Sequence, residues 1–199
     1  MQNNIRPTLY IDFDNTLFNS TKKFVDMWKR YNNGKSTYKP IHWTDIYTYD
    51  FKELNVSKEE MWSYFNSPEF FVNLEFLDSA ESVINILLEK GYKIKIPTMG
   101  KTKNLSFKES LLNAKFRDQV EFIGIDIDVY QDKSHIDMSD GIQIDDEVRR
   151  FNTNARHKIC FGDIYEWNEE WQGVRCWNWI DVLNYIEALE RNNYEELLY

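Results

Sequence analysis

The sequence predicts an α/β fold, a Rossmann-like parallel sheet with helices on both faces and a small helical cap inserted after the first strand. Short apolar segments, such as 157–161, alternate with segments of helical periodicity through the second half of the chain. The segment 19–78 interrupts this alternation, because it follows the first strand and is helical and rich in aromatic residues. We therefore expect a core formed by residues 1–18 and 79–199, with residues 19–78 as the cap.

The first strand is predicted over residues 8–13, and a helix follows it. Asn19 or Ser20 can cap the start of this helix, and Gly34 lies just beyond its end. Apolar residues recur at the spacing of one helical face: Phe24, Met27, Trp28 and Tyr31. Residues 32–56 show little periodicity and are expected to form loops and short elements.

Two further helices are predicted before the second strand. Ser57 and Glu60 have the spacing of a capping box, which indicates that a helix begins there. Asp78 is the expected cap of the next helix, which would end at Lys90, before Gly91.

The remaining elements alternate regularly. Helices are expected over 104–114 and 179–191, with Asn178 as the cap of the second. Strands are expected over 92–98, 120–125, 141–144, 157–161 and 174–177. This alternation indicates a parallel sheet covered on both faces.

Composition restricts the function classes. The chain has 199 residues and a net charge of −9, with no clustered basic face, which disfavours duplex nucleic acid as a partner. No apolar stretch is long enough for a membrane helix, and no signal peptide is evident. Cys160 and Cys176 match no zinc motif and are expected to be buried free thiols. We expect a cytoplasmic protein, and the sequence leaves open whether it forms a homodimer.

Acidic, hydroxyl and basic residues lie where the predicted strands end. Asp12 and Asp14 follow the first strand, and Thr98 follows the second. Lys133 precedes the strand 141–144, and Asp145 and Asp146 follow it. Carboxylates are costly at the end of an apolar strand unless they are paired, hydrated or bound to a metal. Several of them at one sheet edge would form the oxygen-rich site that Mg²⁺ prefers.

This pattern resembles the haloacid dehalogenase-like (HAD) phosphatase superfamily. Its signature is an apolar strand ending in D-x-D-x-T, then a Ser or Thr, a Lys and an acidic pair. The corresponding residues are Asp12, Asp14, Thr16, Thr98, Lys133, Asp145 and Asp146. The segments 69–75, 132–146 and 177–180 look most like the 5'(3')-deoxyribonucleotidases, which have a small helical cap between the first two motifs.

A mechanism follows for these residues. Asp12 would attack phosphorus and form an aspartyl-phosphate, while Asp14 would protonate the leaving oxygen and later deprotonate the attacking water. Lys133 and Thr98 would stabilise charge on the transferred phosphoryl group. Mg²⁺ would be held by the carboxylates of Asp12 and Asp145, and the resemblance implies that the backbone oxygen of Asp14 is a third ligand.

Thr16 and Asp146 are expected to support this site from behind. Asp146 would orient Lys133 or a metal-bound water. An alternative role for Asp145 and Asp146 is to cap a helix beginning at Glu147, which is compatible with metal binding.

The other assignments also have alternatives. Thr98 could be a turn residue that follows Pro97. Lys133 could be a solvated surface lysine, in which case Lys101 or Lys103 would serve in its place.

The sequence departs from the deoxyribonucleotidase pattern at two points. Asn15 and Thr16 stand where that family usually has Gly-Val, and Met99 and Gly100 stand where it often has Ser-Pro. Both changes affect phosphate and sugar contacts, so they bear on the substrate more than on the reaction. The alternatives are a HAD phosphatase for another small metabolite or a nucleic-acid 3'-phosphate, and a non-catalytic protein of the same fold.

Substrate selection is expected to come from the cap. Aromatic rings are abundant there and beside it: Phe18, Trp28, Trp43, Trp62, Phe65, Phe70 and Phe71. Stacking of a nucleobase on such a ring contributes about 1–3 kcal/mol, although aromatic residues at helical spacing more often pack in a core. The predicted substrate contacts are Phe18, Trp43, Phe70, Phe71, Met99 and Gly100.

Overall fold

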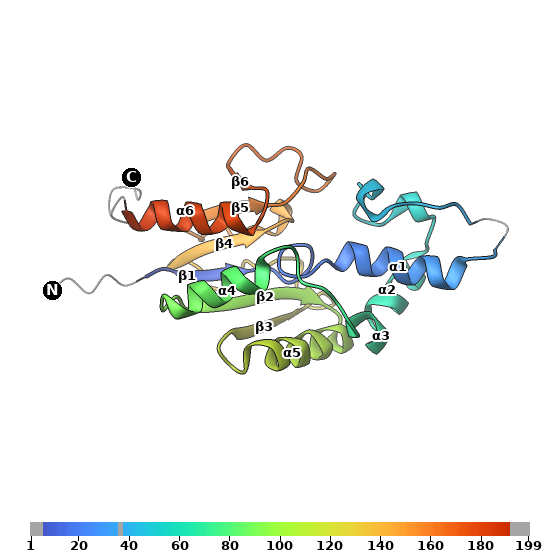
Figure 1. The fold of residues 1–199 in the computed structure, drawn as a ribbon, viewed down its shortest axis with the longest axis horizontal. Coiled ribbons are helices and arrows are strands. Elements are labelled where there is room, and N and C mark those ends of the chain that lie inside the picture. Colours follow the sequence, from blue (N-terminus) through green and yellow to red (C-terminus); the bar gives the residue numbers. More distant parts are fainter. Residues whose placement is uncertain (1–5, 36–37, 192–199) are drawn as a thin grey trace.

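The computed structural model describes residues 6–35 and 38–191, and a single parallel sheet lies at the centre of this part of the chain (Figure 1). Its strands are β1 (Thr8–Ile11), β2 (Ile94–Gly100), β3 (Glu121–Asp126), β4 (Gly141–Asp145), β5 (His157–Phe161) and β6 (Val174–Cys176). Their spatial order is β3-β2-β1-β4-β5-β6, and every neighbouring pair is parallel. The predicted α/β fold is confirmed.

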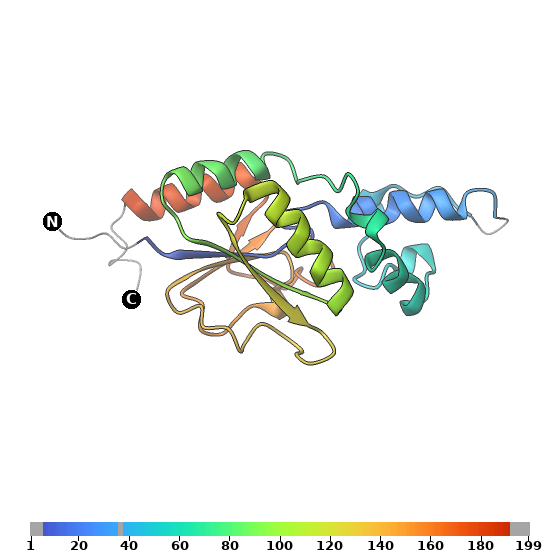
Figure 2. The ribbon, with the colours of Figure 1, turned by 90° about the horizontal axis from the view of Figure 1, so that it is seen from below.

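Six α-helices accompany this sheet in the described ranges. They are α1 (Ser20–Asn32), α2 (Lys58–Phe65), α3 (Pro68–Phe71), α4 (Ala80–Glu89), α5 (Thr102–Phe116) and α6 (Trp179–Arg191). Helices α4 and α6 lie side by side on one face of the sheet (Figure 2). Helix α5 connects β2 to β3, contacts both strands and shares one apolar cluster with α4 and α6, so these three helices cover the same face of the sheet. Loop residues such as Met138 and Ala155 cover the other face, so the prediction of helices on both faces is wrong. No helix in the described ranges is long and apolar enough to cross a membrane.

The core lies where the central strand is covered on both faces. All four residues of β1 are buried, as expected for an inner strand of a parallel sheet. Gly141 begins β4 beside Thr8, where an added Cβ would lie 2.1 Å from the Thr8 carbonyl oxygen. Only glycine therefore permits this close pairing of β1 with β4. On the opposite side, Tyr10 packs with Met138 and Ala155 in a smaller apolar cluster.

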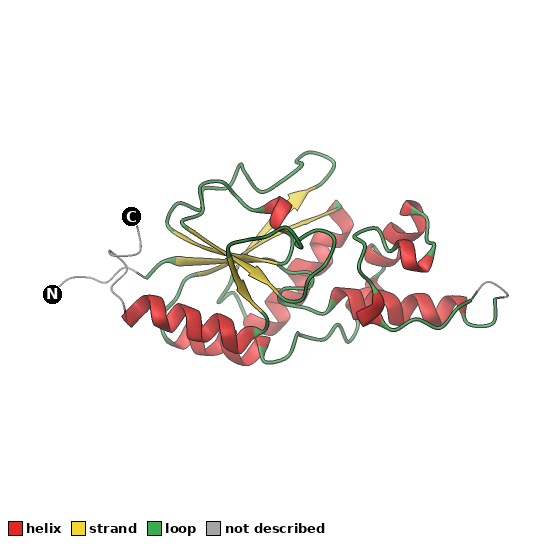
Figure 3. Cartoon of the chain, turned by 90° about the horizontal axis from the view of Figure 1, so that it is seen from above, coloured by secondary structure: helices red, strands yellow, loops and turns green. Residues whose placement is uncertain are grey.

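The segment containing α1, α2 and α3 lies beyond the carboxyl ends of the strands (Figures 1 and 3). It has aromatic packing of its own, because the ring of Phe24 on α1 lies 4.2 Å from Phe51 and 5.2 Å from Phe65. A boundary between cap and core at residues 18 and 79 remains a prediction. The terminal parts of the predicted core, 1–5 and 192–199, lie outside the described residues.

Several predicted helix starts agree with the structure. The side chain of Asn19, and not that of Ser20, caps α1 by accepting from the Lys22 amide at 3.1 Å. Ser57 caps α2 as predicted, accepting from the Glu60 amide. Asn178 accepts from the Asp181 amide at the start of α6.

Two predicted caps are wrong. The cap residue of helix α4 is Ser79, one position after the predicted Asp78. Ser79 has a left-handed φ of 66°, and its side chain makes no capping hydrogen bond. Residue Glu147, and not Asp146, precedes the 3-10 helix η3 (Val148–Arg150). The side chains of Asp145 and Asp146 are instead occupied by the site described below.

Both cysteines are buried free thiols, as predicted. Burial raises the pKa of Cys160 to about 12 and that of Cys176 to about 11. Neither thiol is therefore expected to act as a nucleophile at neutral pH.

Candidate active site

The first part of the site is the turn that follows β1. Asp12 comes directly after this strand, and its backbone N–H donates to the carbonyl of Ile144 on β4 at 2.9 Å. The backbone N–H of Asp14 then donates to Asp12 Oδ2 at 3.0 Å. Asn15 has a φ of 51°, a left-handed conformation that Asn tolerates better than most residues. The chain therefore turns sharply here and leaves both aspartates at the carboxyl edge of the sheet.

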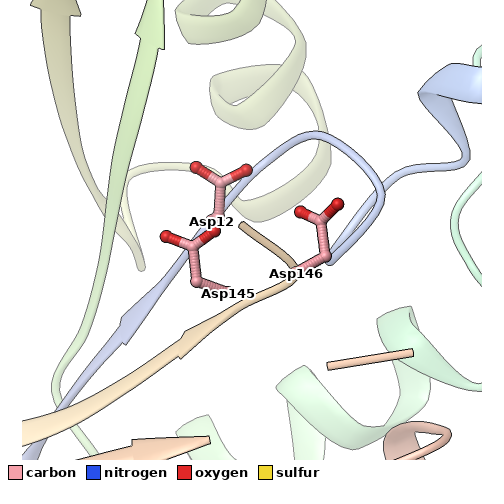
Figure 4. A group of neighbouring side chains, drawn as sticks. All are labelled: Asp12, Asp145 and Asp146. Carbon is pink, nitrogen blue, oxygen red and sulfur yellow. The ribbon is translucent and has the colours of Figure 1, made fainter. Parts of the chain in front are cut away.

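The neighbouring strand supplies two more carboxylates. Asp145 is the last residue of β4, and Asp146 follows it. One oxygen of each of Asp12, Asp145 and Asp146 lies within 4.8 Å of the others (Figure 4). Three hard carboxylate oxygens at this spacing fit a magnesium ion, which takes oxygen ligands. The adjacency of β1 and β4 in the sheet is what brings them together.

A buried lysine joins two of these carboxylates. Lys133 is 2% exposed, and its Nζ donates to Asp12 Oδ1 at 2.5 Å and to Asp145 Oδ2 at 2.6 Å. Asn152 Nδ2 donates to the Lys133 carbonyl at 2.9 Å and so anchors its backbone. Lys133 is thus no surface lysine, and Asp12 and Asp145, rather than Asp146, orient it.

Two lysines proposed as substitutes for Lys133 lie elsewhere. The ammonium of Lys101 is 5.7 Å from the ring centroid of Trp62. That of Lys103 lies over Phe107. Neither is therefore paired with the acidic group.

Asp146 is held by a different set of donors. The Thr16 hydroxyl donates to Asp146 Oδ1 at 3.3 Å, and the indole Nε1 of Trp167 donates to Oδ2 at 2.9 Å. The Asp146 amide donates back to the Thr16 hydroxyl oxygen at 3.0 Å. These contacts fix the Asp146 carboxylate, and the supporting role of Thr16 stays a prediction.

Burial governs the electrostatics of the acidic group. It raises the pKa of Asp12 to about 7, although the positive charge of Lys133 opposes this shift. Burial, followed by the charges of Asp145 and Asp12, holds the pKa of Asp146 well above its usual range. Burial alone would lower the pKa of Lys133, but Asp12 and Asp145 outweigh it and hold that pKa above the usual lysine value. When all three carboxylates are ionised, their charge exceeds what Lys133 neutralises, so a bound cation would favour the ionised forms.

Thr98 belongs to a second polar cluster, and no motif in the sequence indicated its central residue, Lys108. Thr98 is fully buried inside β2, so it is not a turn residue. Its hydroxyl accepts from Lys108 Nζ at 2.8 Å, and the same ammonium donates to Asp14 Oδ2 at 2.5 Å. Lys108 is one of several lysines in a helical segment, and only the packing of α5 against β2 distinguishes it.

A cavity of about 410 Å³ opens above the acidic group. Asp12, Asp14, Lys133 and Asp145 contribute to its lining. Apolar and aromatic side chains from both the 19–78 segment and the core form much of the remaining walls: Tyr49, Phe51, Met61, Trp62, Phe65, Met99, Ile127, Tyr130 and Trp167. Polar and charged side chains, among them Lys58, Gln131 and Arg150, also line the cavity. The cavity therefore combines the charged residues of the site with aromatic side chains in its walls.

The comparison with protein families gives one match. Residues 6–191 match the family described as 5' nucleotidase, deoxy (pyrimidine), cytosolic type C protein. The chain belongs to this nucleotidase family. A comparison with curated proteins finds no match.

Solved structures share the fold of this nucleotidase at low identity. A predicted phosphatase from Clostridium acetobutylicum is 16% identical, with a TM-score of 0.63 over 92% of this chain and 100% of the other. A HAD-superfamily hydrolase from Geobacter sulfurreducens is 11% identical, with a TM-score of 0.60 over 91% of this chain and 96% of the other. A HAD hydrolase from Bacillus subtilis, solved bound to magnesium, is 9% identical, with a TM-score of 0.51 over 91% and 98%. The chain is thus a phosphomonoester hydrolase of the 5'-nucleotidase type with a HAD-like fold.

Most of the aromatic contacts predicted for the nucleotidase are corrected by its structure. Phe18 is fully buried, with its ring 4.5 Å from Phe13 and 4.3 Å from Phe76. Phe70 is fully buried as well, 4.9 Å from the ring of Phe65. Neither ring lines the cavity, because each packs against other rings in the core.

Phe71 and Trp43 also lie away from the cavity lining. The ring of Phe71 packs 5.3 Å from Phe107 on α5, and Trp43 packs against the core beside His42. Of the two residues after Thr98, Met99 lines the cavity as predicted. Gly100 is not part of the lining, and an added Cβ there would lie 2.4 Å from Asn104 Oδ1. Gly100 therefore serves the packing of α5 on β2.

Proposed function

We propose that this nucleotidase is a magnesium-dependent enzyme that removes phosphate from nucleoside monophosphates, preferably deoxynucleotides, through a phosphorylated Asp12. The observation that carries the proposal is the position of Asp12. It lies between a neutralising ammonium, that of Lys133, and the carboxylates of Asp145 and Asp146, at the floor of an aromatic cavity.

In the first half of the reaction, an oxygen of Asp12 attacks phosphorus. The bond between phosphorus and the nucleoside oxygen breaks, and that oxygen takes a proton from Asp14. Lys133 stabilises the added negative charge on the phosphoryl oxygens, since its ammonium already lies 2.5 Å from the attacking carboxylate.

In the second half, water attacks the phosphorus of the aspartyl-phosphate. Asp14 accepts the proton from this water, the bond between Asp12 and phosphorus breaks, and inorganic phosphate leaves. Asp14 lines the cavity with a partly exposed side chain, which supports its exchange of protons with a bound ligand.

Magnesium fits the acidic group on the chemistry of its donors. Asp12 and Asp145 would hold the ion, with the backbone oxygen of Asp14, and the fixed carboxylate of Asp146 lies beside them. When bound, the ion would reduce the repulsion between the Asp12 carboxylate and an anionic phosphate. The magnesium-bound relative from Bacillus subtilis supports this choice of metal.

The cavity favours a nucleotide over a sugar phosphate. Its upper walls carry the rings of Tyr49, Phe51, Trp62 and Phe65, on which a base can stack. A net charge of −9 and the absence of a basic stripe in the sequence argue against duplex nucleic acid. We further propose a cytoplasmic location, which the description of the family supports, and leave open a homodimer.

The test is a phosphate-release screen across nucleoside and deoxynucleoside 5'- and 3'-monophosphates, with sugar phosphates as controls, in Mg²⁺ and in excess chelator. We expect release from nucleotides that requires Mg²⁺. Activity confined to sugar phosphates would overturn the substrate class, and full activity in chelator would overturn the role of the metal.

A further inference from the structure

Lys108 is a charged residue at an apolar position of α5. The buried residues of this helix include Leu105, Leu112 and Phe116, and Lys108 lies on the same face with only 1% of its surface exposed. We propose that Lys108 is a positioning residue, which holds the Asp14 carboxylate and the Thr98 hydroxyl in the orientation that phosphoryl transfer needs. This inference rests on the proposed function, because it assigns Asp14 the proton transfers described above.

The ammonium of Lys108 is fully used by the site. It donates to Asp14 Oδ2 at 2.5 Å, to Thr98 Oγ1 at 2.8 Å and to the Met99 carbonyl at 3.0 Å. An ammonium has three hydrogens, so each has an acceptor. Lys108 is not part of the cavity lining, which leaves it behind the residues that face a ligand.

Packing alone does not explain a lysine here. Removing an ammonium from water costs several kcal/mol, and well-packed apolar residues often replace buried ion pairs without loss of stability. Lys108 is buried on the apolar face of α5, and its Nζ is 5.1 Å from the ring centroid of Phe13. A methionine would fill this space at lower cost, so the charge is better explained by its effect on the groups that it contacts.

One of these groups is the Asp14 carboxylate, which Lys108 fixes from one side. Ser20, at the start of α1, donates to Asp14 Oδ1 at 2.5 Å, while Lys108 donates to Oδ2. Two donors from separate elements define the plane of the carboxylate. Without Lys108, one oxygen loses its partner and the group can rotate away from the leaving oxygen.

The other group is the Thr98 hydroxyl, which Lys108 sets as a donor. Because the Thr98 oxygen accepts from an ammonium, its own hydrogen must point elsewhere. Within the described ranges, no protein atom accepts that hydrogen. Thr98 is fully buried and is not part of the cavity lining, so its donation to a phosphoryl oxygen stays a prediction.

The experiment compares two esters of different leaving-group basicity in the variant Lys108→Met. A nucleoside leaving group needs the proton from Asp14, whereas the nitrophenolate of 4-nitrophenyl phosphate leaves without one. We expect kcat/KM for a deoxynucleoside monophosphate to fall by about 10²- to 10⁴-fold, the size of a lost general acid. For 4-nitrophenyl phosphate we expect a loss at least about tenfold smaller, since only the Thr98 contact is affected there.

Two further variants complete the test. Lys115→Met, an exposed lysine on the same helix, should leave both values unchanged. In an Asp14→Asn background, adding Lys108→Met should cause little further loss with the nucleotide, because residues that act through one another are not additive. If Lys108→Met does not fold, Lys108→Gln is compared in the same way, because it keeps a donor without the charge.

The possible failures are distinguishable. Equal losses with both esters, in a wild type active on both, would overturn the positioning role and leave the proposed function standing. Full additivity with Asp14→Asn would also overturn it. A wild type inactive on both esters would refute the proposed function, and the role of Lys108 would fall with it.

Discussion

At the scale of single residues, the site depends on one lysine that sits between two carboxylates. Lys133 bridges Asp12 and Asp145, and Lys108 occupies the equivalent position between Asp14 and Thr98. Asp12 and Asp14, the two aspartates of the D-x-D motif, thus each contact a different buried lysine. This arrangement fixes the two carboxylates separately, as two different chemical roles require.

The residue whose loss is expected to matter most is Asp12. Asp12→Asn keeps the size of the side chain but removes the nucleophile, so phosphate release should fall by more than about 10³-fold. Phosphate release from a deoxynucleotide and circular dichroism of the variant check this. Asp26→Asn, an exposed aspartate on α1, is the matched control. An Asp12→Asn variant with wild-type turnover would exclude the aspartyl-phosphate mechanism.

At the scale of elements, the helices of the 19–78 segment present different faces to the cavity and to the core. On α2, Trp62 and Phe65 reach the cavity, while Phe70 on α3 packs behind them. Aromatic residues of this segment therefore line the cavity or pack in the core according to the face of the helix on which they lie.

Two variants separate these roles. Trp62→Ala should raise KM for a nucleotide by roughly 5- to 150-fold, which corresponds to the loss of about 1–3 kcal/mol of stacking. Phe70→Ala should leave KM unchanged and lower the free energy of unfolding by about 3–5 kcal/mol. Steady-state kinetics and urea denaturation measure the two effects. An exchange of effects between the variants would contradict the cavity described here.

At the scale of the whole molecule, the burial of two carboxylates makes the stability of the metal-free protein depend on pH. The pKa of Asp12 is raised to about 7 by burial, and that of Asp146 is also raised, whereas both groups ionise near pH 4 in an unfolded chain. Between these values the folded state binds more protons than the unfolded state. The free energy of unfolding therefore falls as the pH rises through this window.

Magnesium should reverse this loss, because it binds the ionised carboxylates and competes with protons. We expect Mg²⁺ to raise the melting temperature more at about pH 8 than at about pH 5.5. Thermal denaturation with Mg²⁺ and with chelator at both pH values tests this, with Ca²⁺-free buffer throughout. An equal shift at the two pH values would show that the ion does not bind these carboxylates.

The sequence by itself determined the fold class, the six strands and the main acidic residues. Period-two and period-3.6 patterns report burial directly, and the D-x-D-x-T motif and the pair at 145–146 follow strands that the parallel topology brings to one edge. Lys133 lies in the loop between β3 and β4, and the fold brings it to the same edge. Hydrophobic periodicity and short motifs involve residues close together in the chain, so they can be recognised from the sequence alone.

Only the tertiary structure decided which side chains face the cavity. No local pattern separates the buried rings of Phe18 and Phe70 from that of Phe65, which lines the cavity, and Lys108 resembles the other lysines of its helix. What distinguishes them is the element packed against each face, which depends on contacts between residues far apart in the chain. The same reason explains Trp167, whose bond to Asp146 joins two loops that only the order of β4 and β5 places side by side.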